Sequence, residues 1–270
     1  MSVESGNERR FGGVARLFGD AAAYRLREAH ACVVGIGGVG SWTVEALARS
    51  GVGRLTLIDL DMVAESNTNR QIHALEGLYG MAKVDAMRDR IARINSACEV
   101  RCIEDFVTPE NCETLLAGEF DVVVDAIDQV KPKIAMIRQC RTARRPIVVV
   151  GAAGGKIDPT RVICGDLAQT VQDPLLAKIR SQLRREQGYS RDPKKKFGIA
   201  AIYSDEAMRY PENRGHCATD KTAPGLNCAG FGSSVCVTSV FGMIAASEAI
   251  QRILATAPRG REYLARSDAE

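Results

Sequence analysis

The glycine-rich run Gly35-Ile-Gly37-Gly38-Val-Gly40 constrains the fold of this chain more than any other feature. It follows the apolar run Ala31–Val34 and leads into a stretch with helical spacing, Gly38–Ser50. Glycines in such a turn let the backbone bend sharply and approach phosphates, whose charge then meets the N-terminus of the helix. Asp59 closes the next apolar run, where a carboxylate can accept hydrogen bonds from ribose hydroxyls. Together these features predict a nucleotide-binding unit.

Apolar runs and amphipathic stretches alternate through the first half of the chain. Such alternation predicts a mostly parallel sheet covered on both faces, which is a doubly wound, Rossmann-like α/β fold. The expected strands are Ala31–Val34, Leu55–Ile58, Val100–Ile103, Asp121–Asp125 and Ile147–Val150. The expected helices after the first are Lys83–Asn95, Pro109–Leu116 and Lys131–Arg144. Thr108 is expected to cap the second of these three, with Pro109 in its first turn.

The alternation weakens after Gly151. We expect an antiparallel continuation around Arg161–Cys164, a helix at Pro174–Gln187 and an irregular segment at 204–230. The pattern therefore divides the chain into a nucleotide-binding domain, 1–165, and a C-terminal extension, 166–270. We expect the extension to carry substrate-facing loops and a final helix, and to form one structural unit with the domain.

The segment Ala229–Ser247 contains no charged residue and approaches the length that crosses a membrane. Serine, threonine and glycine dilute its hydrophobicity, and it continues into the amphipathic stretch Glu248–Arg252. Helices buried on all sides in α/β proteins have the same composition. The sequence therefore favours a buried helix over a membrane anchor.

Composition excludes several classes of protein. The nine cysteines contain no C-x-x-C pair, which argues against a secreted disulfide framework and against a zinc site of paired thiolates. A formal net charge of +3 is too small for a dedicated nucleic-acid coat protein. The N-terminus is polar and contains acidic residues, so it predicts neither a signal nor a transit peptide, and the expected compartment is the cytoplasm.

The glycine run and Asp59 suit NAD as well as ATP, and three residues further along distinguish these ligands. Arg70 follows the second expected strand, Lys83 opens the next helix and Asp128 follows the fourth strand. Carboxyl ends of parallel strands share one edge, so these side chains converge above the glycine turn. Each residue taken alone has another interpretation: Arg70 as a surface ion-pair partner, Lys83 as a solvated helix residue and Asp128 as a helix cap. Together, two cations and a carboxylate for Mg²⁺ predict a triphosphate. The pyrophosphate of a dinucleotide does not need these groups, because the helix N-terminus largely satisfies its charge.

These motifs resemble the ubiquitin-activating-enzyme-like adenylyltransferase superfamily over roughly residues 9–165. The motifs are Gly35–Gly40 with Ser41, Leu57–Asp61, Ser66–Gln71, Lys83 and Asp125–Asp128. The resemblance implies an ATP site made of Gly35, Gly37, Gly38, Gly40, Asp59, Asp61, Asn67, Asn69, Arg70, Lys83 and Asp128. It implies that Arg70, Lys83 and Asp128 are catalytic, with Mg²⁺ on Asp128. It also implies a homodimer in which Arg10 or Arg16 reaches the nucleotide of the partner.

Further motifs are similar to the bacterial tRNA threonylcarbamoyladenosine dehydratases. They are Arg10–Gly19, Asn69–Leu75, Gly151–Pro159, Gln172–Leu175 and Cys228–Gly232. This resemblance implies ATP-dependent cyclisation of threonylcarbamoyladenosine beside the tRNA anticodon, through adenylation of its carboxylate and ring closure. ATP, Mg²⁺ and a monovalent cation are the cofactors to be considered. The alternatives are an adenylyltransferase that activates the C-terminus of a ubiquitin-like sulfur carrier, and a non-catalytic nucleotide-binding partner in sulfur trafficking.

The basic stretch Arg184–Lys196 is a candidate tRNA-contacting surface, because cations that contact phosphates supply affinity without reading sequence. The alternative is that this stretch is a solvated helix end with a loop. The basic cluster in 138–145 is likewise either a tRNA-contacting surface or a set of side chains that face solvent. The candidate contacts are Arg184, Arg185, Arg191, Lys194, Lys195 and Lys196.

The cysteines Cys217 and Cys228 lie in the irregular segment. The resemblance implies a link to a cysteine-desulfurase partner, so Cys228 is a candidate thiol for thioester or persulfide chemistry. The alternative is that both are small apolar residues.

Overall fold

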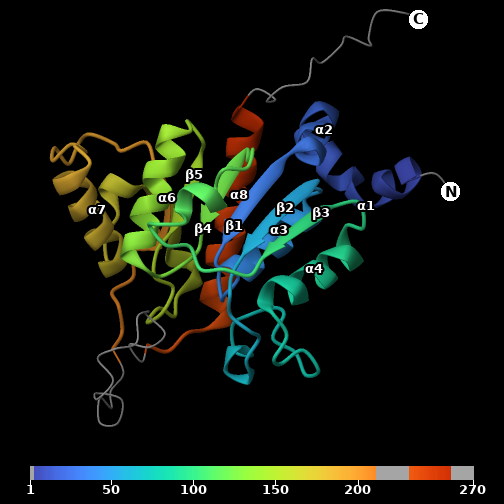
Figure 1. Cartoon of the computed structure of the whole chain (residues 1–270), viewed down its shortest axis with the longest axis horizontal. Helices are drawn as coiled ribbons and strands as arrows, with labels where there is room; N and C mark the ends of the chain where they lie inside the picture. Colours follow the sequence, from blue (N-terminus) through green and yellow to red (C-terminus); the bar gives the residue numbers. More distant parts are fainter. Residues whose placement is uncertain (1–2, 211–230, 257–270) are drawn as a thin grey trace, which may run out of the picture.

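The computed structural model describes residues 3–210 and 231–256. Within these residues the strands form one seven-stranded sheet in the order β3-β2-β1-β4-β5-β7-β6 (Figure 1). All neighbours pair in parallel except β6 and β7, which are antiparallel. The strands are β1 (His30–Val34), β2 (Arg54–Ile58), β3 (Glu99–Ile103), β4 (Val122–Asp125), β5 (Ile147–Val150), β6 (Val162–Asp166) and β7 (Ala200–Ser204). The expected doubly wound α/β fold is confirmed.

Both faces of the sheet carry helices, and the strands alternate their side chains between two cores. In β1, Ala31 and Val33 belong to one buried cluster, whereas Cys32 and Val34 belong to the other. Figure 1 places α7 at one end of the molecule and α1 at the other. The helices are α1 (Val3–Phe18), α2 (Asp20–Glu28), α3 (Gly40–Arg49), α4 (Lys83–Ile94), α5 (Cys112–Leu115), α6 (Val130–Thr142), α7 (Pro174–Glu186) and α8 (Val235–Ala255).

The strand order creates a switch point between β1 and β4. The chain runs from β1 outward through β2 to β3, and then returns to the other side of β1 with β4 and β5. Loops that follow β1 and β4 therefore diverge and leave a crevice at the carboxyl edge of the sheet. The glycine run and the Asp125–Asp128 turn are these two loops.

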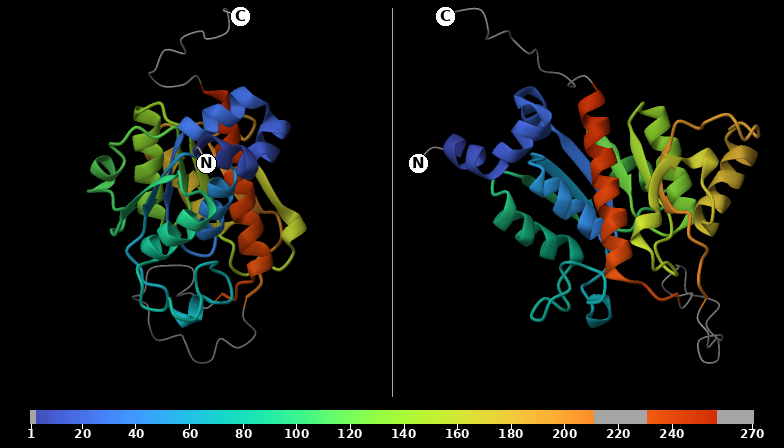
Figure 2. Two further views of the ribbon diagram at one scale, coloured as in Figure 1. Left: turned by 90° about the vertical axis from the view of Figure 1, so that its right-hand side faces the viewer. Right: turned by 180° about the vertical axis from the view of Figure 1, so that it is seen from behind.

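The apolar C-terminal segment forms α8, which lies across the sheet and packs most closely on α3 (Figure 2). It is the one helix in the described part of the chain that is long and apolar enough to span a membrane. Half of its most apolar stretch is buried inside the protein. Phe241, Ala245 and Ala249 are fully buried, whereas Met243 is 42% exposed. The expected C-terminal helix is confirmed, and it packs its buried side chains against the rest of the protein. The helix is buried along one face, and it begins at Val235, with Ser234 as its N-cap.

Three local predictions also need correction. The helix expected at Pro109–Leu116 begins at Cys112, because the amide N–H of Thr108 donates to Asn111 Oδ1 and holds the preceding residues in a turn. The chain before residue 30 forms two helices, α1 and α2, that the sequence analysis did not predict. Strand β7, which continues the sheet inside the segment 166–270, was not predicted from the sequence either.

Candidate active site

The glycine turn connects β1 to α3 in a conformation that side chains would obstruct. Gly35 has φ +86°, and a Cβ there would lie 2.9 Å from Ile127 Cγ2. A Cβ on Gly40 would lie 1.7 Å from the Gly35 carbonyl oxygen, so the turn closes tightly only with glycine. A Cβ on Gly38 would meet the side chain of Arg70 at 3.2 Å, whereas Gly37 has only Gln71 within 4 Å. The turn thus exposes backbone at the start of a helix, as a phosphate site requires.

Asp59 links the glycine turn to the end of β2. Its Oδ2 accepts a hydrogen bond from the Ile36 amide at 2.6 Å, and its Oδ1 accepts one from the Asp61 amide at 2.9 Å. Burial raises the pKa of this carboxyl, while the positive charge of Lys83 lowers it in part. Asp59 is 8% exposed and borders the crevice, which is the position that the sequence analysis assigned to ribose recognition.

Lys83, the first residue of α4, is buried and forms an ion pair with Asp61. Its Nζ donates to Asp61 Oδ2 at 2.6 Å, while the Asp61 side chain is 53% exposed. Asp61, which the resemblance assigns to the ATP site, contacts Lys83 with its carboxylate. This contact holds the ammonium at the edge of the sheet, with two further N–H bonds available to another acceptor.

The loop that carries Asn67, Asn69 and Arg70 lies over the glycine turn. Asn67 Oδ1 accepts from the Ala64 amide at 3.0 Å and closes the short 3-10 helix Glu65–Asn67. Asn69 Nδ2 donates to the Ser233 carbonyl at 3.0 Å, and its Oδ1 accepts from Arg70 at 2.9 Å. Arg70 also donates to the Ser66 carbonyl at 2.8 Å. These bonds fix the guanidinium within its own loop, while Cγ and Cδ of Arg70 lie beside Gly38. Partial burial lowers the pKa of Arg70.

Asp128 lies half-buried in the turn after β4. This turn adjoins the glycine run, because the Ala126 carbonyl would be 3.0 Å from a Cβ on Gly35. Beneath the turn, Lys133 Nζ donates to Asp125 Oδ1 at 2.9 Å and to the Val150 carbonyl at 2.7 Å. Asp125 and Lys133 are both fully buried, so this ion pair supports the turn from inside the protein.

Two buried polar atoms beside the glycine turn lack a hydrogen-bond partner within the described structure. They are Ser41 Oγ, in the first turn of α3, and Gln71 Oε1, in the loop above it. Buried polar groups are nearly always paired, so these two atoms are candidates for hydrogen bonds to a ligand. Both residues were quoted among the family motifs, but the sequence analysis did not single them out as binding residues. A hydroxyl directly after a glycine run is the signal that identifies Ser41.

The residues present fit a magnesium ion that is shared with a triphosphate. The described residues contain no group of three or more His, Cys, Asp or Glu side chains that could hold a metal alone. Magnesium bound to nucleotides commonly takes one or two carboxylates and completes its shell with phosphates and water. Asp128, half-buried in the segment after β4 that adjoins the glycine run, is a carboxylate of this kind.

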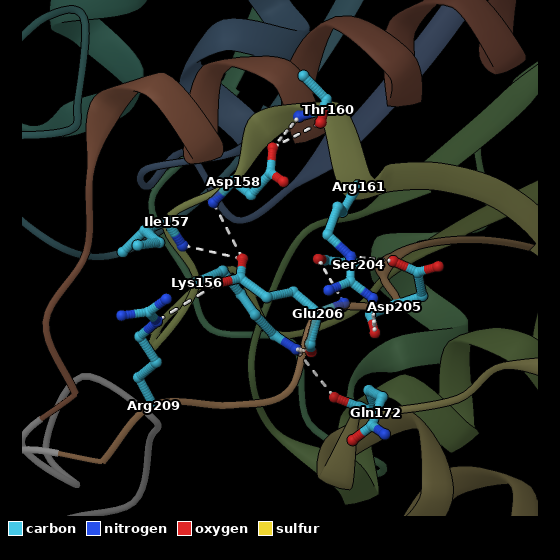
Figure 3. Close-up of polar contacts among 10 residues, drawn as sticks. All are labelled: Lys156, Ile157, Asp158, Thr160, Arg161, Gln172, Ser204, Asp205, Glu206 and Arg209. Carbon is cyan, nitrogen blue, oxygen red and sulfur yellow. Dashed lines mark hydrogen bonds and ion pairs between the residues drawn. The ribbon is translucent and has the colours of Figure 1, made fainter.

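A second polar cluster occupies the carboxyl end of β5 and β7 (Figure 3). Lys156 is 1% exposed and its Nζ donates to the carbonyl oxygens of Gln172 and Glu206. Glu206 Oε2 accepts from the amides of Ile157 and Asp158, each at 3.0 Å. These contacts join the runs 151–159 and 172–175, which lie apart in the sequence. A cavity of about 450 Å³ borders the cluster, lined in part by Arg161 and Arg209.

The candidate tRNA-contacting residues lie in the last turn of α7 and in the loop after it, at the amino edge of the sheet. Arg184 Nε donates to the Ser190 carbonyl at 3.1 Å and its guanidinium lies 5.4 Å from the Phe197 ring centroid, so it holds the loop in place. Arg185 pairs with Glu186 at 2.8 Å. The candidates other than Arg184 are all exposed: Arg185, Arg191, Lys194, Lys195 and Lys196. Cys217 and Cys228 lie outside the described residues.

Comparison with known proteins places this site in a family. The model of the ThiF family matches residues 12–269, and the chain belongs to that family. The tRNA threonylcarbamoyladenosine dehydratase of Escherichia coli (strain K12) is 49% identical over 93% of this chain and 95% of that protein. The Haemophilus influenzae protein of the same name is 46% identical over 92% of this chain and 94% of its own length.

Solved structures show the same relationship. The crystal structure of the E. coli dehydratase in complex with ATP has a TM-score of 0.84 and 45% identity, over 94% of this chain and 98% of that one. The same enzyme in complex with AMP gives equal values. The resemblance drawn from the motifs is confirmed.

Proposed function

We propose that this protein is an ATP-dependent tRNA threonylcarbamoyladenosine dehydratase. The observation that carries the proposal is the 49% identity to a dehydratase of that name over nearly the whole chain. The glycine turn beside Arg70, and the pair of Lys83 with Asp61 just after β2, support it. The E. coli relative binds ATP and AMP, which are the substrate and product expected of adenylation. The products here are tRNA carrying the cyclised nucleoside, AMP and pyrophosphate.

The proposed reaction has two steps. A carboxylate oxygen of the threonine moiety attacks the α-phosphorus of ATP, and the bond to the β-phosphate breaks to release pyrophosphate. A nucleophilic atom of the carbamoyl group then attacks the activated carbonyl carbon, loses its proton and closes the ring. AMP leaves with the former carboxylate oxygen, so the nucleoside loses the elements of water. The first step is needed because a free carboxylate oxygen is a poor leaving group.

The residues of the site supply binding and orientation. Glycine-turn amides and the start of α3 bind phosphates, Asp59 binds ribose hydroxyls, and Arg70 and Lys83 stabilise charge on the departing pyrophosphate. Asn67, Asn69 and Asp61 hold the loops that carry these groups. Asp128 would hold Mg²⁺, which shields the phosphate charges when it is bound. Ring closure is intramolecular and needs mainly a correctly held substrate.

The remaining assignments follow from the resemblance. Residues 1–165 activate the carboxylate, and residues 166–270 face the tRNA with the basic side chains of 184–196. The protein acts in the cytoplasm as a homodimer. The resemblance also implies a monovalent cation, a thiol role for Cys228 and a cysteine-desulfurase partner.

The test is a direct conversion assay. Purified protein is incubated with ATP, Mg²⁺ and tRNA that carries threonylcarbamoyladenosine, and the digested nucleosides are weighed by mass spectrometry under mild conditions. We expect a nucleoside lighter by one water and an equivalent amount of AMP. An unchanged nucleoside with ATP bound would contradict the proposal, and ATP–pyrophosphate exchange dependent on a ubiquitin-like carrier would establish the alternative.

A further inference from the structure

A cationic pocket lies at the amino edge of the sheet, opposite to the glycine turn. It opens beside Ile147, the first residue of β5, and Ile199, which precedes β7. The cavity measures about 390 Å³. Its lining includes the cations Arg141, Arg145, Lys196 and Arg252 but no Asp or Glu. Residues from α6, from the loop after α7 and from the last turn of α8 thus meet at one place.

Tilted aromatic rings and guanidinium groups build one wall of this pocket. The rings of Tyr189 and Phe197 lie 4.6 Å apart between centroids. Arg141 lies over the Tyr189 ring at 4.9 Å, and Arg184 lies over the Phe197 ring at 5.4 Å. Asp166 fixes the end of the loop, since its carboxylate accepts from the amides of Phe197 and Gly198 at 2.8 Å. The wall is therefore held in shape before any ligand arrives.

The charge of the pocket is only partly balanced. Arg252 pairs with Glu248 at 2.7 Å, and Arg145 donates to the carbonyl oxygens of Leu116 and Gly118. Arg141 and Lys196 are exposed and form no ion pair within the described residues. A concave site that gathers positive charge and includes exposed guanidinium and ammonium groups matches an oxyanion with several acceptor atoms.

We propose that this pocket binds a backbone phosphate of the tRNA, with Lys196 and Arg141 as its direct contacts. The inference rests on the proposed function, because it takes tRNA as the ligand. The strands between the two edges have four or five residues, roughly 17 Å, so one RNA arm can reach both the glycine turn and the pocket. The aromatic rim favours a polynucleotide over a lone anion, since bases stack on such rings. The pocket would orient the tRNA while the anticodon loop occupies the active site.

Fluorescence anisotropy with labelled tRNA over a series of salt concentrations tests this. For Lys196→Ala we expect roughly tenfold weaker binding and a salt slope smaller by about one, as for the loss of one phosphate contact. Lys196→Arg retains the charge and should restore binding. Arg141→Ala should act like Lys196→Ala. In the dehydration assay both alanine variants should raise the KM for tRNA and leave kcat and ATP affinity unchanged.

Lys178→Ala is the matched control, because Lys178 is an exposed lysine of α7 outside the pocket lining. Equal effects of Lys178→Ala and Lys196→Ala would overturn the inference, as would an unaltered salt slope. A separate binding experiment uses inorganic phosphate as the ligand. If Lys196→Ala abolishes phosphate binding but leaves tRNA binding intact, the pocket binds a free anion and the inference is wrong. Failure of wild-type protein to convert tRNA would remove the proposed function alone, whereas absence of tRNA binding would remove the inference.

Discussion

Two aspartates of one turn have separate tasks. Asp125 is fully buried and pairs with Lys133 at 2.9 Å, so its carboxylate cannot reach a ligand in the crevice. Asp128 follows at the surface of the same turn and is half-buried beside the glycine run. A buried ion pair of this kind is costly to break, because one uncompensated charge then remains inside the protein. Asp125 therefore positions the turn, and Asp128 is the carboxylate to which the proposed function gives a role at the nucleotide.

The Asp128→Asn variant isolates that role. It keeps the shape of the side chain and removes its charge, so we expect turnover to fall by at least about 100-fold. The midpoint of thermal unfolding should stay close to that of the wild type. AMP release measured against Mg²⁺ concentration checks the effect. Asp89→Asn, on the exposed side of α4, is the control and should leave AMP release unchanged. Wild-type turnover in Asp128→Asn would contradict the magnesium assignment.

His73 makes stability depend on pH. Both ring nitrogens lack partners among the described residues, and burial, with the charges of Lys83 and Arg90, lowers the pKa of His73 from 6.5 to about 4. The unfolded chain therefore binds a proton below pH 6.5 that the native state refuses until about pH 4. Folding stability due to His73 is present above pH 6.5 and declines as the pH falls, by up to about 1.4 kcal/mol per pH unit.

Urea unfolding at several pH values measures this slope. Between pH 6.5 and 5, where few carboxyls titrate, the free energy of unfolding of the wild-type protein should change with pH more steeply than that of His73→Leu. The variant should lose less stability on acidification. Parallel pH profiles for the two proteins would show that the native histidine is protonated at an ordinary pKa.

Among the elements, α8 depends on the absence of a side chain at Gly242. A Cβ there would lie 2.6 Å from Trp42 Cβ and 2.7 Å from the Val39 carbonyl oxygen. Trp42 in turn donates its Nε1 proton to the Arg70 carbonyl at 3.0 Å. The contact between α3 and α8 thus also positions the loop that carries Arg70.

We predict that Gly242→Ala destabilises the protein despite the higher helix propensity of alanine, worth about 1 kcal/mol. Overpacking of the α3–α8 contact should lower the free energy of unfolding by about 1–3 kcal/mol. ATP affinity should fall as well, because Trp42 shifts. Denaturant unfolding and calorimetric ATP titration measure both. Ser247→Ala, at an exposed position of α8, is the control and should preserve both values.

For the molecule as a whole, the N-terminal arginines lie far from their own glycine turn. Arg10 donates to Ser96 Oγ at 3.2 Å, just before β3, and Arg16 lies against Gly12. Both positions belong to the amino edge of the sheet, whereas the nucleotide site is at the carboxyl edge. Only a second copy of the chain could bring either arginine to a nucleotide, which is the arrangement proposed for the homodimer.

Complementation tests this arrangement and identifies the arginine. Arg10→Ala or Arg16→Ala is mixed with Asp128→Asn under conditions that exchange subunits. We expect the variant of the acting arginine to be inactive alone and to regain AMP release in the mixture, because one site of each mixed dimer is intact. Arginine variants that keep full activity would contradict a role for these arginines at the partner's nucleotide, and a protein that sediments as a monomer would refute the homodimer proposal.

The sequence by itself determined the sheet of parallel strands, the glycine turn and the order of Asp59, Arg70, Lys83 and Asp128 along it. These features depend on local pattern: apolar runs, helical spacing and glycine. Family motifs then predicted adenylation chemistry, and the nearly full-length likeness to the dehydratases confirms that family. Residues such as Ser41 and Gln71 needed the structure, because only packing shows that their polar atoms lack partners.

Tertiary structure alone decided the contacts between distant segments. The missed strand β7 lies between β5 and β6, although β6 precedes it in the chain. Arg141, Lys196 and Arg252 meet in one pocket only because α6, the loop after α7 and α8 end at the same edge. The partly exposed face of α8 follows from what packs on the sheet rather than from its composition. Local propensity fixes which segments become strands and helices, whereas the burial of their apolar faces against one another fixes which side chains meet.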